Sequence, residues 1–169
     1  MANTWKDGGG SLLSQKPDSN GLDWHERTNI AVQLINDSKE DHIYDLGSGE
    51  CRLSRLIKNK TYYAFDTDNF SIYDDINVVL IDLIEDFPII KEKNSIAICL
   101  GFIDHIVYQN NFDNFMINLS KSFNKVIFSC RAKHEEEIVK VFRKHFKNVE
   151  FIDRTKARPN NQGVYKATK

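Results

Sequence analysis

The chain has 169 residues, and its 23 lysines and arginines nearly balance 24 aspartates and glutamates, which gives a formal net charge of −1. This length is sufficient for one domain with a core of ordinary size and leaves little room for a separate substrate domain. The balanced charge, without an extended basic run, argues against non-specific nucleic-acid binding. No stretch approaches the roughly 20 apolar residues of a membrane span.

The three cysteines, Cys51, Cys99 and Cys130, indicate a reducing compartment. They are odd in number, form no C-x-x-C pair, and two of them lie inside apolar runs. Residues 1–10 also lack the apolar core of a secretory signal. We therefore expect small, buried thiols in a cytoplasmic protein.

The first 26 residues differ in composition from the rest of the chain. They are rich in Gly, Ser and Asn, with consecutive glycines at 8–10, yet they contain Trp5 and Trp24. One hypothesis is that residues 1–26 form an arm that closes as a lid over a bound cofactor and substrate. The alternative is a disordered terminus with a few docking anchors. In either case we expect the main domain to occupy residues 27–169.

Helical and strand patterns alternate from residue 27 onward. Residues 27–36 place Ile30, Ala31, Leu34 and Ile35 on one face of a helix. The last two strand patterns have no helix between them and therefore predict a hairpin. The predicted strands are residues 43–46, 62–65, 78–81, 96–100, 126–129, 149–152 and 163–167, and the other predicted helices are residues 53–58, 112–123 and 135–146.

A glycine-rich turn follows the first predicted strand, in the sequence Asp45-Leu46-Gly47-Ser48-Gly49. Its glycines permit positive φ and let the backbone approach a ligand closely. A dinucleotide-binding turn would need a third small residue where this chain has Arg52. A diphosphate would also lie beside Asp45, and the two anions would repel each other. The turn therefore favours S-adenosylmethionine, which has no phosphate and carries a sulfonium and an ammonium group. A nucleotide-binding protein is the weaker alternative.

Acidic residues also follow the next two predicted strands, Asp66 after residues 62–65 and Asp82 near the end of residues 78–81. Together with the turn, and in this order, they resemble the motifs of class I S-adenosylmethionine-dependent methyltransferases. In that family, the residue that corresponds to Asp66 holds the ribose hydroxyls, and the one that corresponds to Asp82 lies near the adenine amino group. The chain departs from the family in the glycine-rich turn, where the family pattern usually has another glycine at the position of Cys51.

The resemblance covers about residues 27–169 and implies an α/β, Rossmann-like three-layer sandwich. Its sheet would have seven mostly parallel strands in the order 3-2-1-4-5-7-6 and would end in an antiparallel hairpin.

Each motif also has a purely structural interpretation, because a short turn motif can be an ordinary strand-to-helix connection and the two aspartates can be solvated strand ends. The resemblance implies S-adenosylmethionine as the cofactor, bound by Asp45, Gly47, Ser48, Gly49, Asp66, Thr67, Asp82, Leu83 and Leu100.

Methyl transfer needs little from the protein beyond in-line alignment and exclusion of water, because the sulfonium already activates the methyl group. For a hydroxyl acceptor a general base would help, and His105, just past residues 96–100, is the candidate, with Asp104 as its orienting partner. A histidine at this position is also typical of a packing or surface residue. His25 and Glu26 are a second acid–base pair. We expect no metal site, because only Asp104 and His105 stand close together in the sequence.

The residues after the fourth predicted strand, Leu100-Gly101-Phe102-Ile103, lack the D/N-P-P-Y/F signature of methyltransferases that act on nucleic-acid bases. We therefore expect an enzyme that methylates an oxygen or nitrogen of a small polar acceptor. A sugar or surface-polysaccharide precursor is one hypothesis for that acceptor. The alternative is a non-catalytic binding subunit that keeps the fold and exposes an apolar patch to its partner. Nothing in the sequence indicates the oligomeric state.

Overall fold

The computed structural model describes residues 22–156 and 161–169, with side chains from Glu26 onward. One sheet runs through these residues. Each predicted strand overlaps an observed one. The strands are β1 (His42–Leu46), β2 (Thr61–Asp66), β3 (Val78–Leu80), β4 (Ser95–Leu100), β5 (Lys125–Arg131), β6 (Asn148–Arg154) and β7 (Gln162–Thr168).

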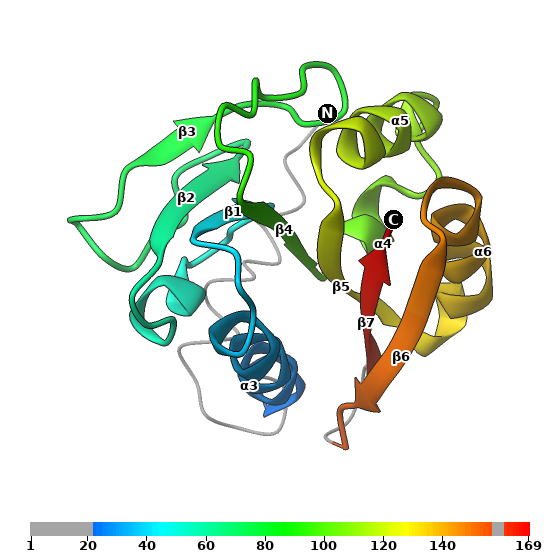
Figure 1. The fold of residues 1–169 in the computed structure, drawn as a ribbon, viewed down its shortest axis with the longest axis horizontal. Coiled ribbons are helices and arrows are strands. Elements are labelled where there is room, and N and C mark those ends of the chain that lie inside the picture. Colours follow the sequence, from blue (N-terminus) through cyan, green and yellow to red (C-terminus); the bar gives the residue numbers. More distant parts are fainter. Residues whose placement is uncertain (1–21, 157–160) are drawn as a thin grey trace.

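The strand order is β3-β2-β1-β4-β5-β7-β6, which confirms the predicted topology (Figure 1). Strands β1 to β5 pair in parallel. Strand β7 is antiparallel to both of its neighbours, β5 and β6, so the predicted hairpin is present. Because parallel strands share one direction, the carboxyl ends of β1, β2, β4 and β5 meet along one edge of the sheet.

Helices cover both faces of the sheet. They are α3 (Leu22–Asn36), α4 (Ile103–Ile106), α5 (Phe112–Ser122) and α6 (Glu135–His145), with two 3₁₀ turns, η1 (Arg52–Arg55) and η2 (Ala132–His134). Successive strand residues point to opposite faces. Tyr44 and Leu46 of β1 pack in the core cluster that contains residues of α5 and α6, whereas Ile43 packs with residues of α3. The result is the predicted three-layer sandwich (Figure 1).

The prediction of a helix over residues 53–58 was wrong. The structure has only the short turn η1, which ends at Arg55. Cys51 before it and Asn59 after it both adopt left-handed backbone conformations, with φ of 58° and 56°. These residues lie on either side of residues 53–58. Within that range, the Lys58 N–H donates to the Asn36 side chain at 3.0 Å, where an α-helix would bond it to the carbonyl four residues earlier. The glycine-rich turn is therefore followed by a single 3₁₀ turn and not by an α-helix.

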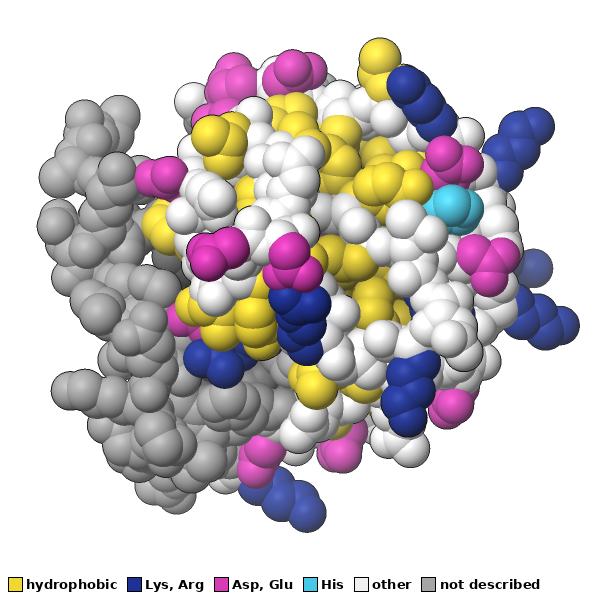
Figure 2. All heavy atoms as spheres, turned by 90° about the vertical axis from the view of Figure 1, so that its left-hand side faces the viewer, with side chains coloured by type: hydrophobic (Ala, Val, Ile, Leu, Met, Phe, Trp, Pro, Cys, Tyr) yellow, Lys and Arg dark blue, Asp and Glu magenta, His cyan; other side chains and the backbone are white. Residues whose placement is uncertain are grey.

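Two connections near the β3 edge are also without helices in the part of the chain that the structure describes. Residues 67–77 and 81–94 form turns and irregular loops. Asp68 and Asn69 each accept a backbone N–H with their side chains, and such local bonds compete with helix formation. Val79 and Leu80 consequently lack a covering helix and are 43% and 61% exposed. Figure 2, which views this end of the molecule, shows hydrophobic side chains at the surface.

Helix α3 begins at Leu22, five residues before the predicted start at residue 27. Residues 22–26 of the proposed arm are therefore helical, and its residues 1–21, with Trp5, lie outside the described residues. None of the helices in the described parts of the chain combines the length and the apolar character that crossing a membrane requires.

Candidate functional site

The candidate site is built from the loops that follow β1, β2, β4 and β5 at the carboxyl edge of the sheet (Figure 1). Strand order reverses between β1 and β4, because β2 and β3 lie on one side of β1 and the later strands on the other. Crevices at such a reversal are the usual ligand sites of open α/β sheets. The predicted turn at residues 45–49 begins in β1, directly beside this reversal.

The glycine-rich turn folds back onto β2. The backbone N–H groups of Gly47 and Ser48 donate to the carbonyl of Phe65, at 2.9 and 3.0 Å. Gly47 has φ of 77°, and a Cβ there would lie 2.7 Å from the Phe102 side chain, so only glycine fits. Gly49 has φ of 50°, but a Cβ there would meet no atom of the described residues within 4 Å. The outer side of Gly49 is therefore open to a ligand.

Asp45 is a buried carboxyl group at the end of β1, and it is only 5% exposed. The Tyr62 hydroxyl donates to its Oδ2 at 2.6 Å. Burial raises the pKa of Asp45 to about 7, and the nearby carboxylate of Asp66 adds to the shift, while Tyr62 and Arg27 oppose it. A buried acid of this kind becomes a good partner for a cation, because a positive charge beside it favours ionisation.

Asp66 connects β2 to the glycine-rich turn. Its Oδ2 accepts the backbone N–H of Gly49 at 2.9 Å, and its Oδ1 accepts that of Thr67 at 2.8 Å. Burial raises the pKa of Asp66, and these two backbone hydrogen bonds oppose that rise. Each carboxylate oxygen has a second acceptor position. Asp66 can therefore hold the turn in shape and still accept hydrogen bonds from a pair of ligand hydroxyls.

The other predicted cofactor residues lie in different environments. Asp82 is exposed, and its Oδ1 accepts the backbone N–H of Ile84 at 3.1 Å, so it also stabilises a local turn. Leu83 is a core residue at 3% exposure. Thr67 is exposed and Leu100 is half-buried at the end of β4. Of this group, Asp82 and Thr67 have side chains open to solvent.

Sequence reasoning missed Arg27, which α3 brings to the same edge of the sheet. Its Nη1 donates to Gln162 Oε1 at 2.9 Å. The same oxygen accepts the Ser129 hydroxyl at 3.0 Å, and Ser129 Oγ in turn accepts the Gly101 N–H at 2.9 Å. A Cβ at Gly101, where φ is 74°, would collide with the Arg27 guanidinium. Arg27 is therefore fixed between β7 and the loop after β4, near Asp45.

The sequence did contain a signal for Arg27. It precedes Ile30, Ala31 and Leu34 by three, four and seven positions, so it shares the apolar face of the helix. A cation on that face is uncommon, because a buried charge needs a partner. Only the fold shows that Gln162, 135 positions away, is a partner.

The predicted acid–base residues follow β4. Asp104 lies in α4, and its side chain is 1% exposed. The backbone N–H of Arg131 reaches its Oδ1 and Oδ2 at 3.0 and 3.2 Å, and His134 Nδ1 lies 3.0 Å from Oδ1. His105 is exposed, and partial desolvation followed by the charge of Arg131 lowers its pKa to about 4. His134, which sequence reasoning did not select, thus lies at hydrogen-bonding distance from Asp104.

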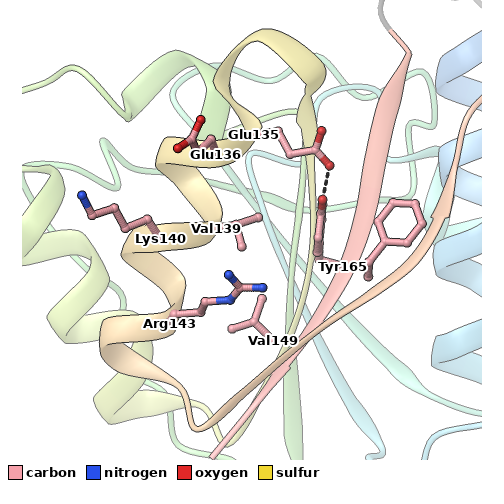
Figure 3. Close-up of a pocket in the computed structure, with 8 residues that line it drawn as sticks. Glu135, Glu136, Val139, Lys140, Arg143, Val149 and Tyr165 are labelled. Carbon is pink, nitrogen blue, oxygen red and sulfur yellow. Dashed lines mark hydrogen bonds between the residues drawn. The ribbon is translucent and has the colours of Figure 1, made fainter.

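Within the described residues, no group of three or more His, Cys, Asp or Glu side chains is arranged to hold a metal ion. A hollow of about 440 Å³ lies elsewhere, between α6 and the β6–β7 hairpin (Figure 3). One wall is held by Glu135, which accepts a hydrogen bond from Tyr165 and pairs with Arg154 at 2.5 and 2.7 Å. None of the predicted cofactor or acid–base residues lines this hollow.

No protein-family model matches the chain, and its sequence matches none of the curated proteins. Several solved structures have a similar fold. Magnesium protoporphyrin IX methyltransferase (ChlM) from Synechocystis, with bound S-adenosylmethionine, is 14% identical with a TM-score of 0.72, and the match covers 99% of this chain and 92% of the other. The N-methyltransferase NodS from Bradyrhizobium japonicum, in complex with S-adenosylhomocysteine, is 9% identical with a TM-score of 0.69. This match covers 99% of this chain and 98% of the other.

A TehB-like S-adenosylmethionine-dependent methyltransferase from Corynebacterium glutamicum is 13% identical, with a TM-score of 0.63 and covers of 85% of this chain and 86% of the other. At these identities, the similarity concerns the fold. The chain has the fold of class I S-adenosylmethionine-dependent methyltransferases, as its motifs predicted.

Proposed function

We propose that this chain binds S-adenosylmethionine at the carboxyl edge of its sheet and transfers the methyl group to a small polar acceptor. The observation that carries the proposal is the arrangement of Asp45, Asp66 and the open side of Gly49 at the reversal of strand order. It combines a buried acid for a cation, free acceptor positions for hydroxyls, and close backbone approach. S-adenosylmethionine offers the matching groups.

The nucleoside half of the cofactor would lie over β2 and β3. Asp66 would accept hydrogen bonds from the two ribose hydroxyls through its remaining acceptor positions. Gly47 and Ser48 hold the turn that forms the floor, and Gly49 allows the ligand to approach. The adenine would lie beyond Asp66, with the exposed Asp82 carboxylate accepting from its amino group. The side chains of Thr67 and Leu100 and the backbone around Leu83 would line this part of the site.

The methionine half would lie between Asp45 and Arg27. Its ammonium group complements the buried Asp45 carboxylate, and its carboxylate complements the Arg27 guanidinium. A dinucleotide fits this site poorly, because its diphosphate would face Asp45. The charges on this side of the site therefore support S-adenosylmethionine over nicotinamide and flavin dinucleotides.

The acceptor would bind beside the loop that carries Asp104 and His105. The exposed, neutral imidazole of His105 is suited to hydrogen bonding with a polar group of the acceptor. We propose an oxygen or nitrogen acceptor, and sugar or surface-polysaccharide precursors are the first class to screen. A cytoplasmic location stays a prediction from the sequence. The three cysteines that led to it are free and buried in the structure.

A second candidate function is a non-catalytic binding subunit with this fold. It is favoured by the exposed hydrophobic side chains near the β3 edge, where Val79 and Leu80 lack a covering helix (Figure 2). Such a subunit would expose an apolar patch to a protein partner. It would show no methyl transfer with any acceptor.

The first experiment is calorimetric titration of the purified chain with S-adenosylmethionine, S-adenosylhomocysteine and NAD. We expect both adenosyl ligands to bind and NAD not to bind. The Asp66→Ala variant should lose the binding, because the ribose contacts and the Gly49 hydrogen bond disappear together. Asp74→Ala removes an exposed aspartate from the loop before β3 and should bind as the unaltered chain does. Failure of both adenosyl ligands to bind a folded sample would contradict the proposal.

A further inference from the structure

Asp104 and His134 form a buried carboxylate–imidazole pair beside the proposed cofactor site. Asp104 follows β4 and His134 lies in η2, directly after β5, so two adjacent parallel strands deliver the pair to the same edge. The Asp104 side chain is 1% exposed and that of His134 is 14% exposed. The aspartate is therefore enclosed, whereas the imidazole keeps part of its surface accessible.

The contacts of Asp104 fix the orientation of the imidazole. Both carboxylate oxygens accept the Arg131 N–H, which prevents rotation of the carboxylate. A carboxylate only accepts hydrogen bonds, so at 3.0 Å the His134 Nδ1 donates its proton to Oδ1. The proton is then on Nδ1, and the lone pair is on Nε2. Positioning of a histidine by a carboxylate in this way is a general feature of acid–base sites.

Hydrogen bonds and strand pairing connect the pair to the residues of the cofactor site. Arg131, whose N–H binds Asp104, is paired with Gln162 across β5 and β7, and the Gln162 side chain accepts a hydrogen bond from Arg27. Arg27 also acts on the pKa of Asp45. The Asp104–His134 pair is therefore on the methionine side of the site, where the methyl group of a bound cofactor would be.

Tyr108 adds an aromatic surface next to the pair. Its ring meets the His134 ring edge-on, with centroids 5.4 Å apart and planes at 84°. The tyrosine is 65% exposed, and its hydroxyl interacts with Glu137. An exposed aromatic face beside an imidazole is suited to stacking with the apolar face of a sugar-like acceptor. Glu137 and Asp104 are the charged groups that act on this tyrosine.

We propose that His134, positioned by Asp104, accepts the proton of a hydroxyl group on the methyl acceptor. This inference rests on the proposed function and narrows it to O-methylation. The hydroxyl oxygen attacks the methyl carbon, an O–C bond forms as the C–S bond breaks, and the electron pair of that bond returns to sulfur. The hydroxyl proton moves to Nε2 of His134. Asp104 stabilises the resulting imidazolium, which later loses the proton to water.

The test is nuclear magnetic resonance on the full chain with S-adenosylmethionine isotope-labelled in its methyl group. The attacking oxygen lies about 3 Å from the methyl carbon and within hydrogen-bonding distance of Nε2, so the methyl and the ring should be about 6 Å apart or less. We expect nuclear Overhauser contacts between the methyl and the ring protons of His134. Contacts to His105 without any to His134 would overturn the assignment.

A second measurement tests the role of Asp104 through the imidazole nitrogen signals. In the unaltered chain, we expect His134 to show the tautomer protonated at Nδ1. Asp104→Asn should change this tautomer balance without loss of the bound cofactor, whereas Asp113→Asn, an exposed aspartate in the first turn of α5, should not. An unchanged tautomer in a folded Asp104→Asn variant would overturn the positioning role. The methyl contacts need no variant, so they remain decisive if Asp104→Asn does not fold.

The same spectra separate this inference from the proposed function. Binding of S-adenosylmethionine shifts the amide signals of Gly47 and Gly49 whatever the role of His134. Binding without His134 contacts contradicts only the assignment of the base. Absence of any binding contradicts the proposed function, and the inference is then lost with it.

Discussion

Burial of the Asp45 carboxyl group has two opposite effects. Its ionised form lowers the stability of the fold, yet the same buried carboxylate is a strong partner for a cationic ligand. Its pKa is about 7 in the folded chain against an ordinary value of 3.8. Folded chains therefore hold the proton more tightly than unfolded ones do. Above about pH 4 the unfolded chain ionises first, and the carboxyl group costs stability that increases until the pH reaches about 7.

Asp45→Asn should therefore stabilise the fold at pH 8. Asparagine is neutral and keeps an acceptor for the Tyr62 hydroxyl, so the free energy of unfolding should rise by up to about 4 kcal/mol. Near pH 4 the two chains should differ little. Urea unfolding at both pH values measures the difference, and calorimetry of the same variant should find that S-adenosylmethionine binding is lost. A variant less stable than the unaltered chain at pH 8 would contradict the buried-acid interpretation.

The glycine-rich turn offers a matched pair of substitutions at the scale of one structural element. Gly47 and Gly49 both have positive φ, but only at Gly47 would a Cβ clash, with Phe102 at 2.7 Å. Gly47→Ala should cost about 2–4 kcal/mol, from the left-handed conformation and the overpacking together. Gly49→Ala should cost about 1–2 kcal/mol from conformation alone. Chemical denaturation measures both, and equal losses would show that the clash is relieved by movement of Phe102.

The same turn illustrates what sequence patterns could and could not predict about the elements. Strands and the two C-terminal helices were predictable because apolar residues recur with strand or helix periods in these segments. The predicted helix over residues 53–58 is replaced by a turn that ends at Arg55, and the Lys58 N–H donates to the Asn36 side chain in place of a helical carbonyl. Asn36 is 22 positions from Lys58, so this contact could not be predicted from the local apolar pattern. The early start of α3 at Leu22 was missed because residues 22–26 have no clear apolar stripe.

At the scale of the whole molecule, the site depends on contacts between distant segments. Asp45 and Asp66 were predictable, because each lies at the end of its own strand and parallel strands end at one edge. The partners of Arg27 and His134 were not, since Arg27 meets Gln162 across 135 positions and His134 meets Asp104 across 30. Such pairs follow from strand order and from the packing of α3 and η2. The acceptor side of the site is accordingly where the structure adds most.

Because the proposed cofactor contacts loops from several strands, its binding should stabilise the whole domain. A ligand at a hundred times its Kd adds about 2.7 kcal/mol to the free energy of unfolding, which in a chain of this size raises Tm by about 5–10 °C. Thermal unfolding with S-adenosylhomocysteine should show this rise. It should be absent with NAD and in Asp66→Ala, and present in Asp74→Ala. A rise that Asp66→Ala retains would mean that the ligand binds elsewhere, since Asp66 joins β2 to the turn that follows β1.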